Sequence, residues 1–333
     1  MSRLFSMRVA GIVFFGFFFI IPLLGINQFY LYVSTMVLIY IILTLGLNIL
    51  VGYAGQLAFA SAAMFGIGAY VCGLLIKHFG ASYWLAAPGG VIAAMAVGTL
   101  LALPALRLSG IYLALATLAF AQCTLWVMTH WISVTYGASG FTIGSISFWP
   151  LPISSDDGMY YLSWTCCVAL LVLTRNLIQS RIGRAFVALR DHEIAAQSLG
   201  IYLLKYKALA FALSGFYAGV AGVLFAGLLT FIGPESFGLQ QMVLQLSAMV
   251  MGGTATVAGS VLGGFLIVFV QELVREFKFS IEIAFGALLA LFVIVRPAGL
   301  IDLIRLVRPN WREKLHGADD SDPVTNRKAV AAQ

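Results

Sequence analysis

Long apolar stretches separated by short polar segments run along almost the whole chain. Most hold about 20 residues, which as a helix cross a hydrocarbon layer of ~30 Å. Leu57–Ile76 is rich in small residues and Leu239–Met251 is short, so either is a candidate for a broken or re-entrant helix. The pattern predicts eight to ten membrane segments, at Val9–Ile26, Tyr30–Val51, Leu57–Ile76, Trp84–Leu106, Ile111–Trp131, Met159–Ile178, Ala208–Leu229, Leu239–Met251, Val257–Val274 and Ile281–Val295.

Composition supports lipid as the solvent for most of the chain. Of the 333 residues, 61% are hydrophobic and only 10% are charged, whereas a soluble domain carries roughly 25% charged residues. Backbone groups in lipid must be hydrogen-bonded internally, and the apolar runs are too long and unbroken for barrel strands. The predicted fold class is therefore an all-α polytopic membrane protein.

The positions of the charges predict the orientation. The formal net charge is +6, but Arg and Lys lie in loops and tails, where the positive-inside rule explains them without a nucleic-acid partner. The rule places both termini in the cytoplasm and the loop Ile132–Gly158, which has no Lys or Arg, outside. Inside are then Arg3, Arg8, Arg107, the basic residues of Arg175–Lys207 and the tail from Arg296; outside are Lys77, Arg275 and Lys278.

The chain divides into a transmembrane domain, residues 1–306, and a polar cytoplasmic tail, residues 307–333, that is predicted to be disordered. No segment is left for a nucleotide-binding domain, and the Walker A pattern is absent. The cysteines, Cys72, Cys123, Cys166 and Cys167, lack metal-ligand spacing. We therefore predict no metal, no cofactor and no enzymatic activity, since no catalytic pair of residues is apparent.

One densely charged segment, Arg181–Lys207, separates the two hydrophobic halves and forms most of the predicted cytoplasmic loop 179–207. It contains the pattern E-x-A-A-x-x-x-G, from Glu193 to Gly200. Asp191 is a candidate N-cap, Glu193 would lie in the first helical turn, and Gly200 can end the helix. The spacing of Ala188, His192, Ala195, Ala196 and Leu199 predicts a flat stripe of small residues that suits docking on another protein. The alternative is a positive-inside loop packed on its own helix ends.

Two glycine-rich stretches are candidates for helix breaks beside a translocation path. Gly46–Tyr70 contains the run Gly52–Gln56, and Gly252–Gly259 joins two later apolar runs. Broken helices in a membrane are tolerated only against protein or a wet cavity; close helix packing through small residues is the alternative. A third stretch, Tyr136–Gly144, is either a pore-mouth turn or only a turn. The candidate path residues are Asn48, Gly52, Tyr53, Gly55, Gln56, Gly252 and Gly253.

Taken in order, these patterns resemble the permease subunits of the branched-chain amino-acid class of ABC importers, the LivH/LivM family, nearer its LivM side. The resemblance spans most of the chain. The similar residues are Gly46–Gln56, Phe65–Tyr70, Arg181–Ala185, Arg190, Glu193, Ala195, Ala196, Gly200, Lys207, Phe211–Ser214, Ala218–Gly222, Gly252, Gly253, Gly259, Gly263, Gly264 and Arg296–Leu300. Two departures stand out. Ile194 is inserted after Glu193, and Leu57–Ala60 replaces the family's Ser-Leu-Gly-His.

The resemblance implies an importer permease in a bacterial inner membrane. Its partners would be two ATP-binding subunits, a second homologous permease subunit and an extracytoplasmic substrate-binding protein. Its substrates would be branched-chain or related amino acids, with urea, short amides or aromatic acids as alternatives. The implied coupling residues, which meet the ATPase, are Arg184, Arg190, Asp191, Glu193, Ala195, Ala196 and Gly200.

A self-contained channel or secondary carrier is the hypothesis from another class. Glycine breaks along an uncharged path would suit a channel for a small neutral solute. The scarcity of ionisable residues within the predicted spans argues against an ion-driven carrier.

Overall fold

The computed structural model describes residues 27–144, 146 and 155–276, and its elements are helical apart from two short strands. The predicted segments Val9–Ile26 and Ile281–Val295, the Arg296–Leu300 motif and the tail 307–333 lie outside the described residues. The elements, with η for π- and 3₁₀-helices, are α2 (Gln28–Leu47), η2 (Asn48–Tyr53), α3 (Ser61–Phe79), α4 (Tyr83–Ala105), α5 (Ile111–His130), α6 (Ile132–Thr135), η3 (Gly137–Ser139), β1 (Phe141–Thr142), α7 (Ser155–Gln179), α8 (Arg181–Asp191), α9 (Glu193–Ser198), α10 (Leu203–Leu229), β2 (Phe231–Ile232), η4 (Pro234–Phe237), α11 (Leu239–Gly252) and α12 (Val257–Glu276).

Within the described ranges, six helices are long and apolar enough to cross a membrane: α2 with η2, α3, α4, α5, α7 and α10. They coincide with six predicted segments, so these predictions are confirmed. The short segment Leu239–Met251 is α11, whose 14 residues reach only about 21 Å and cannot span the layer as one helix. Leu57–Ile76 is corrected at its start, because residues 57–60 are not helical and α3 begins at Ser61.

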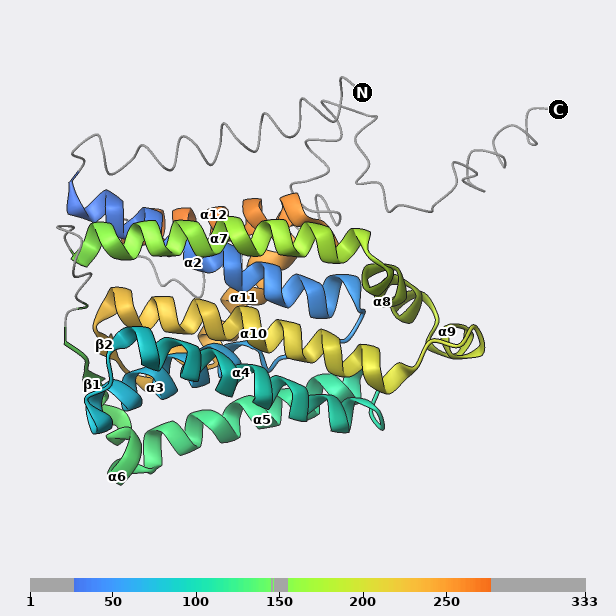
Figure 1. The fold of residues 1–333 in the computed structure, drawn as a ribbon, viewed down its shortest axis with the longest axis horizontal. Helices are drawn as coiled ribbons and strands as arrows, with labels where there is room; N and C mark the ends of the chain where they lie inside the picture. Colours follow the sequence, from blue (N-terminus) through green and yellow to red (C-terminus); the bar gives the residue numbers. More distant parts are fainter. Residues whose placement is uncertain (1–26, 145, 147–154, 277–333) are drawn as a thin grey trace, which may run out of the picture.

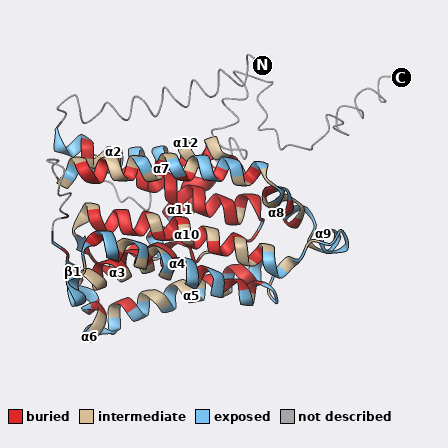
Figure 2. Ribbon diagram, in the orientation of Figure 1, coloured by how far each residue is buried: buried red, intermediate tan, exposed pale blue. Residues whose placement is uncertain are grey.

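Helix α2 forms the centre of the molecule. Its sequence is apolar on every side, which is typical of a helix in a protein interior or in lipid. From Met36 to Leu47 each of its residues is buried, and it packs against α7, α10, α11 and α12. Figure 2 shows buried residues running along the middle layer and exposed residues on the outer helices.

Close helix contacts through glycine join α3, α4 and α10. A Cβ on Gly68 would lie 2.8 Å from Cα of Gly219 in α10, and one on Gly98 would lie 2.6 Å from the Phe211 carbonyl oxygen. Such spacing leaves no room for side chains and lets the backbones gain dispersion contacts, which drive helix association in lipid. Small-residue packing, the alternative given for the glycine-rich stretches, is therefore present at Gly68.

The loops gather at two opposite ends of the molecule (Figure 1). At one end, the stretch Tyr136–Gly144 forms η3 and strand β1, and β1 pairs antiparallel with β2. At the other end, α8 and α9 project beyond the helices. The predicted outer loop and the predicted cytoplasmic loop are thus well separated, while their assignment to the two sides of the membrane stays a prediction.

Candidate functional site

The charged segment folds as two helices that meet at His192. The Ser180 side chain caps the start of α8 by accepting a hydrogen bond from the Ile182 amide at 3.1 Å. His192 is extended, with φ −155°, and precedes α9 without a side-chain cap. The prediction of Asp191 as N-cap is therefore wrong, because Asp191 is the last residue of α8. Gly200 has φ +82°, a left-handed conformation that suits glycine and ends α9 as predicted.

The prediction that the small residues form one continuous helix face is also wrong. The break at His192 interrupts the helical spacing, so Ala188 and Ala196 do not continue one surface. Ala196 is buried, whereas Ala195 and Leu199 are exposed. The exposed tip of α9 instead presents Ile194, 83% exposed, and Leu199, 81% exposed. Ile194, the insertion relative to the family pattern, thus points away from the rest of the chain.

The Glu193 carboxylate joins the start of α9 to two other parts of the chain and, through Lys207, to a third. Its Oε1 lies 2.8 Å from Nζ of Lys207, and its Oε2 lies 3.0 Å from the same atom. Lys207, in the first turns of α10, also donates to the Ala105 carbonyl oxygen at the end of α4, at 3.0 Å. Gln56, after the first glycine break, donates from Nε2 to Oε1 of Glu193 at 3.1 Å. The side chain of Lys207 is only 4% exposed, so Glu193 and the Ala105 oxygen compensate a buried charge.

A second connection runs from α8 to the same break. Arg190 donates from Nη1 to the Gly52 carbonyl oxygen at 3.1 Å, and its exposed side chain also pairs with Asp191 at 3.4 Å. Gly55 packs directly on Arg190: a Cβ there would lie 2.8 Å from the arginine Cα, and φ at Gly55 is +68°. Only glycine meets both conditions without strain.

The first glycine break is a π-helical turn tied to the second. Asn48, at the start of η2, donates from Nδ2 to the Thr256 carbonyl oxygen at 2.8 Å and to Oγ of Ser260 at 2.7 Å. Its Oδ1 accepts from the Ala255 amide at 2.8 Å. Gly52 leaves room for this contact, since a Cβ there would meet Oδ1 of Asn48. Short π-helical turns of this kind occur frequently at functional sites.

Some of the predicted site residues therefore form one connected region, and the others lie outside its hydrogen bonds. Gln56, Glu193, Arg190, Gly52 and Asn48 link α8 and α9 to both glycine breaks. Gly253 forms the turn between α11 and α12 with φ +119°, and Gly252 packs on the Gly259 carbonyl. Tyr53 is buried, and Arg184 is exposed on α8. Whether these residues couple to an ATPase or line a path stays a prediction.

Three residues of this region were missing from the predicted site: Lys207, Thr256 and Ser260. Lys207 was among the residues similar to the family pattern, but no role at the site was predicted for it. Its pairing with Glu193 depends on the turn at Gly200, which spacing alone does not reveal. Among the described residues, no group of three or more His, Cys, Asp or Glu side chains is placed to hold a metal ion.

Comparison with known proteins now decides the family. The family described as the branched-chain amino acid transport system permease component matches residues 29–296, which is most of the chain. The chain belongs to this family. It is therefore a multi-pass permease of the inner membrane and the membrane-spanning type of subunit found in ABC importers, which work with ATPase and substrate-binding partners.

Individual relatives support the assignment. The chain is 33% identical over 297 residues to the high-affinity branched-chain amino acid transport system permease protein LivM of Escherichia coli, covering 82% of this chain and 70% of the relative. It is 27% identical over 281 residues to the permease protein LivH of the same organism, covering 79% and 91%. A probable LivM of Methanocaldococcus jannaschii is 24% identical, with 83% and 94% covered. No solved structure matches the chain.

Proposed function

We propose that this permease carries branched-chain or related amino acids into the cell, driven by ATP hydrolysis on separate subunits that dock on α8 and α9. The substrate class is inferred from the printed names of the relatives, LivM and LivH. The chain itself is assigned no catalysis, since hydrolysis belongs to the docked subunits. A second homologous permease, two ATP-binding subunits and an extracytoplasmic binding protein complete the proposed assembly.

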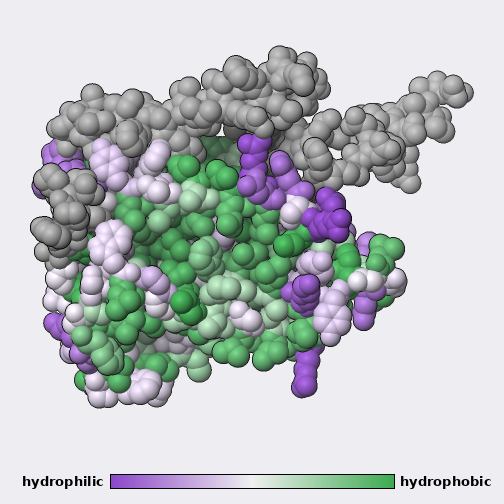
Figure 3. Space-filling model, viewed as in Figure 1, coloured by the Kyte–Doolittle hydropathy of each residue, from purple (hydrophilic) through white to green (hydrophobic). Residues whose placement is uncertain are grey.

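The exposed tip of α9 is the observation that supports the docking proposal. Ile194 and Leu199 are more than four-fifths exposed, and Tyr202 beside them is also exposed. Figure 3 shows hydrophobic atoms at this end of the molecule next to hydrophilic ones, apart from the broad apolar flank of the membrane helices. Exposed apolar side chains within a polar rim are typical of a protein interface.

The contacts of Glu193 and Arg190 suggest how docking moves the membrane helices. A displacement of α9 would shift the Glu193 carboxylate and with it Gln56 and Lys207. A displacement of α8 would act on Gly52 through Arg190. Asn48 would then carry the movement to the turn between α11 and α12. Packed side chains and hydrogen bonds of this kind are the physical means by which two distant sites bias one another.

Charged substitutions at the α9 tip test this proposal. We expect the double variant Ile194→Asp/Leu199→Asp to lower co-purification of the ATPase subunits and ATP-driven leucine uptake at least 10-fold, because carboxylates would be buried without partners in the interface. Phe79→Asp is the matched control: Phe79 is 80% exposed but lies at the opposite end, beside α6. Full ATPase association by the double variant would contradict the proposed docking surface.

Reconstitution in liposomes distinguishes the importer hypothesis from the hypothesis of a self-contained channel. Purified chain alone in liposomes is expected to be inactive, and uptake is expected only with the ATPase subunits, the second permease and the binding protein. Leucine flux through the chain alone, without ATP, would replace the importer hypothesis by the channel hypothesis.

A further inference from the structure

Helix α11 carries two glutamines on a face that is turned into the protein. Gln241 and Gln245 lie one helical turn apart on the same face, and only 7% of the first and 1% of the second are exposed. Tyr40 of α2 donates from its hydroxyl to Oε1 of Gln241 at 3.1 Å, and Ser61 of α3 donates to Oε1 of Gln245 at 2.5 Å. Within the described ranges, neither amide nitrogen has a hydrogen-bond partner. Each glutamine is therefore paired through its oxygen alone.

A buried amide nitrogen without a partner is unfavourable in the interior of a membrane protein. Burial removes the water that would accept its hydrogen bonds, and the low dielectric of the interior increases the cost. Asn48 shows the contrast, because both polar atoms of its amide are hydrogen-bonded within the chain. The unpaired nitrogens of Gln241 and Gln245 therefore favour a second position of α11, in which they meet water or a solute.

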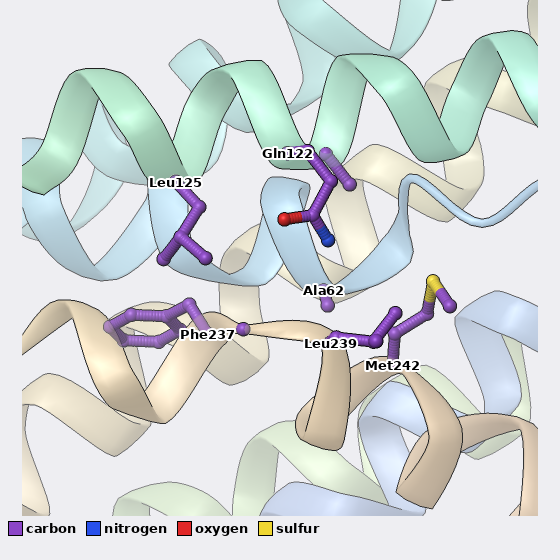
Figure 4. Close-up of a pocket in the computed structure, with 8 residues that line it drawn as sticks. Ala62, Gln122, Leu125, Phe237, Leu239 and Met242 are labelled. Atoms are coloured by element: carbon purple, nitrogen blue, oxygen red, sulfur yellow. The ribbon is translucent and has the colours of Figure 1, made fainter.

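The two ends of α11 are held differently. At its C-terminal end, a Cβ on Gly252 would meet the Gly259 carbonyl oxygen, so the backbones of α11 and α12 are in close contact. At its N-terminal end, the helix follows the extended residue Gly238, and Leu239 is 52% exposed. Figure 4 shows this start of the helix at Leu239, beside α3 and α5. Because hinges lie at the ends of elements, this arrangement allows α11 to pivot near Gly252.

We propose that α11 is a movable helix of the transport cycle. It pivots near Gly252 and turns its glutamine face from the protein interior into the aqueous path of the solute. There the amide nitrogens of Gln241 and Gln245 donate to water and to the carboxylate of the amino acid that is carried, since an N–H group donates and a carboxylate accepts. The structure shows the position in which this face is closed. The inference rests on the proposed function, because the movement belongs to ATP-driven uptake.

Thiol accessibility during turnover tests the movement. Gln245→Cys, and Gln241→Cys as a second variant on the same face, are made in the complete reconstituted transporter after the four native cysteines are replaced by serine. We expect a charged methanethiosulfonate to modify both variants at least 10-fold faster during ATP-driven leucine uptake than without ATP. Ser214→Cys is the matched control and should stay unreactive, because Ser214 is equally buried with an unpaired hydroxyl but lies on α10, where glycine contacts fix the helix. Equal rates with and without ATP at both glutamine positions would overturn the inference.

The double variant Ser61→Ala/Gln245→Leu provides a second measurement that does not depend on cysteine chemistry. It replaces a hydroxyl and its amide partner by apolar groups of similar shape, a change that leaves stability nearly unchanged or raises it. We expect the melting temperature in detergent to be no lower and leucine uptake to fall at least 10-fold, because water does not solvate an apolar face. Ser214→Ala is expected to leave uptake unchanged. Normal uptake by the double variant, or a loss of uptake that accompanies a lower melting temperature, would overturn the inference.

The same measurements distinguish a failure of this inference from a failure of the proposed function. If the parent transporter shows no ATP-driven leucine uptake, the proposed function fails. If the parent transporter is active but the cysteine variants of Gln241 and Gln245 stay unreactive during turnover, only the movement of α11 is rejected.

Discussion

At the scale of single residues, the ion pair of Glu193 with Lys207 is the contact on which the proposed coupling most depends. We expect Lys207→Met to lower ATP-driven uptake about 10-fold, because Glu193 loses its cation and keeps only the side-chain hydrogen bond from Gln56. Removing one partner of a buried pair leaves the other uncompensated. Since Glu193 is a third exposed, water will reduce the cost, and we expect a coupling energy of about 1–3 kcal/mol in a double-mutant cycle.

Lys205→Met is the control for this pair, because Lys205 is exposed two residues earlier on the same helix. The double variant Lys207→Met/Glu193→Gln is expected to be more stable than Lys207→Met alone, since it removes the unpaired charge. Thermal unfolding in detergent and uptake in proteoliposomes measure both effects. Equal behaviour of Lys205→Met and Lys207→Met would refute a specific role for the pair.

At the scale of elements, the close contact of the first glycine break with α8 is the feature to test. We expect Gly55→Ala to destabilise the protein by about 1–3 kcal/mol beyond the cost of its positive φ, because the new Cβ would press on the backbone of Arg190. Gly80→Ala separates the steric cost of the new Cβ from the conformational cost of a positive φ. Gly80 has φ +60° but no atom of the described residues lies within 4 Å of a Cβ placed there, so that variant is subject to the conformational strain alone, roughly 1–2 kcal/mol.

Melting temperatures of the two glycine variants in the same detergent give the comparison, and uptake shows whether α8 has also shifted. A fall in melting temperature that is no larger for Gly55→Ala than for Gly80→Ala would mean that α8 and the break move apart freely. In that case Arg190 could not transmit a displacement of α8 to Gly52.

At the scale of the whole molecule, the separation of the two loop ends predicts a fixed orientation in the membrane. The distribution of Lys and Arg places α8 and α9 in the cytoplasm. In a background without the native cysteines, we expect a membrane-impermeant maleimide to label Phe79→Cys in intact cells and Ile194→Cys only in inside-out vesicles. Labelling of Ile194→Cys from outside would reverse the proposed topology and remove α9 from reach of cytoplasmic ATPase subunits.

Much of the fold was predictable from the local sequence pattern, and the errors in the prediction have local causes. The starts and ends of α4, α5 and α11 fall within one residue of the predicted bounds, because long apolar runs in lipid have little alternative to a helix. The break before α3 was also predictable from Gly52 and Gly55. The prediction for Asp191 was wrong because α8 and α9 are divided by the extended conformation of His192. No glycine or proline at this position indicates the break in the sequence.

The sequence by itself determined that the chain is a helical membrane protein, where most spans lie, and which residue types could break or cap them, since these follow from apolar length and backbone conformation. Tertiary structure alone decided which distant groups meet: Glu193 with Lys207 and Gln56, and Asn48 with Thr256 and Ser260. Asn48 and Ser260, for example, are 212 residues apart in the chain. Their partners are chosen by how α2, α10 and α12 pack, and packing depends on all the helices together.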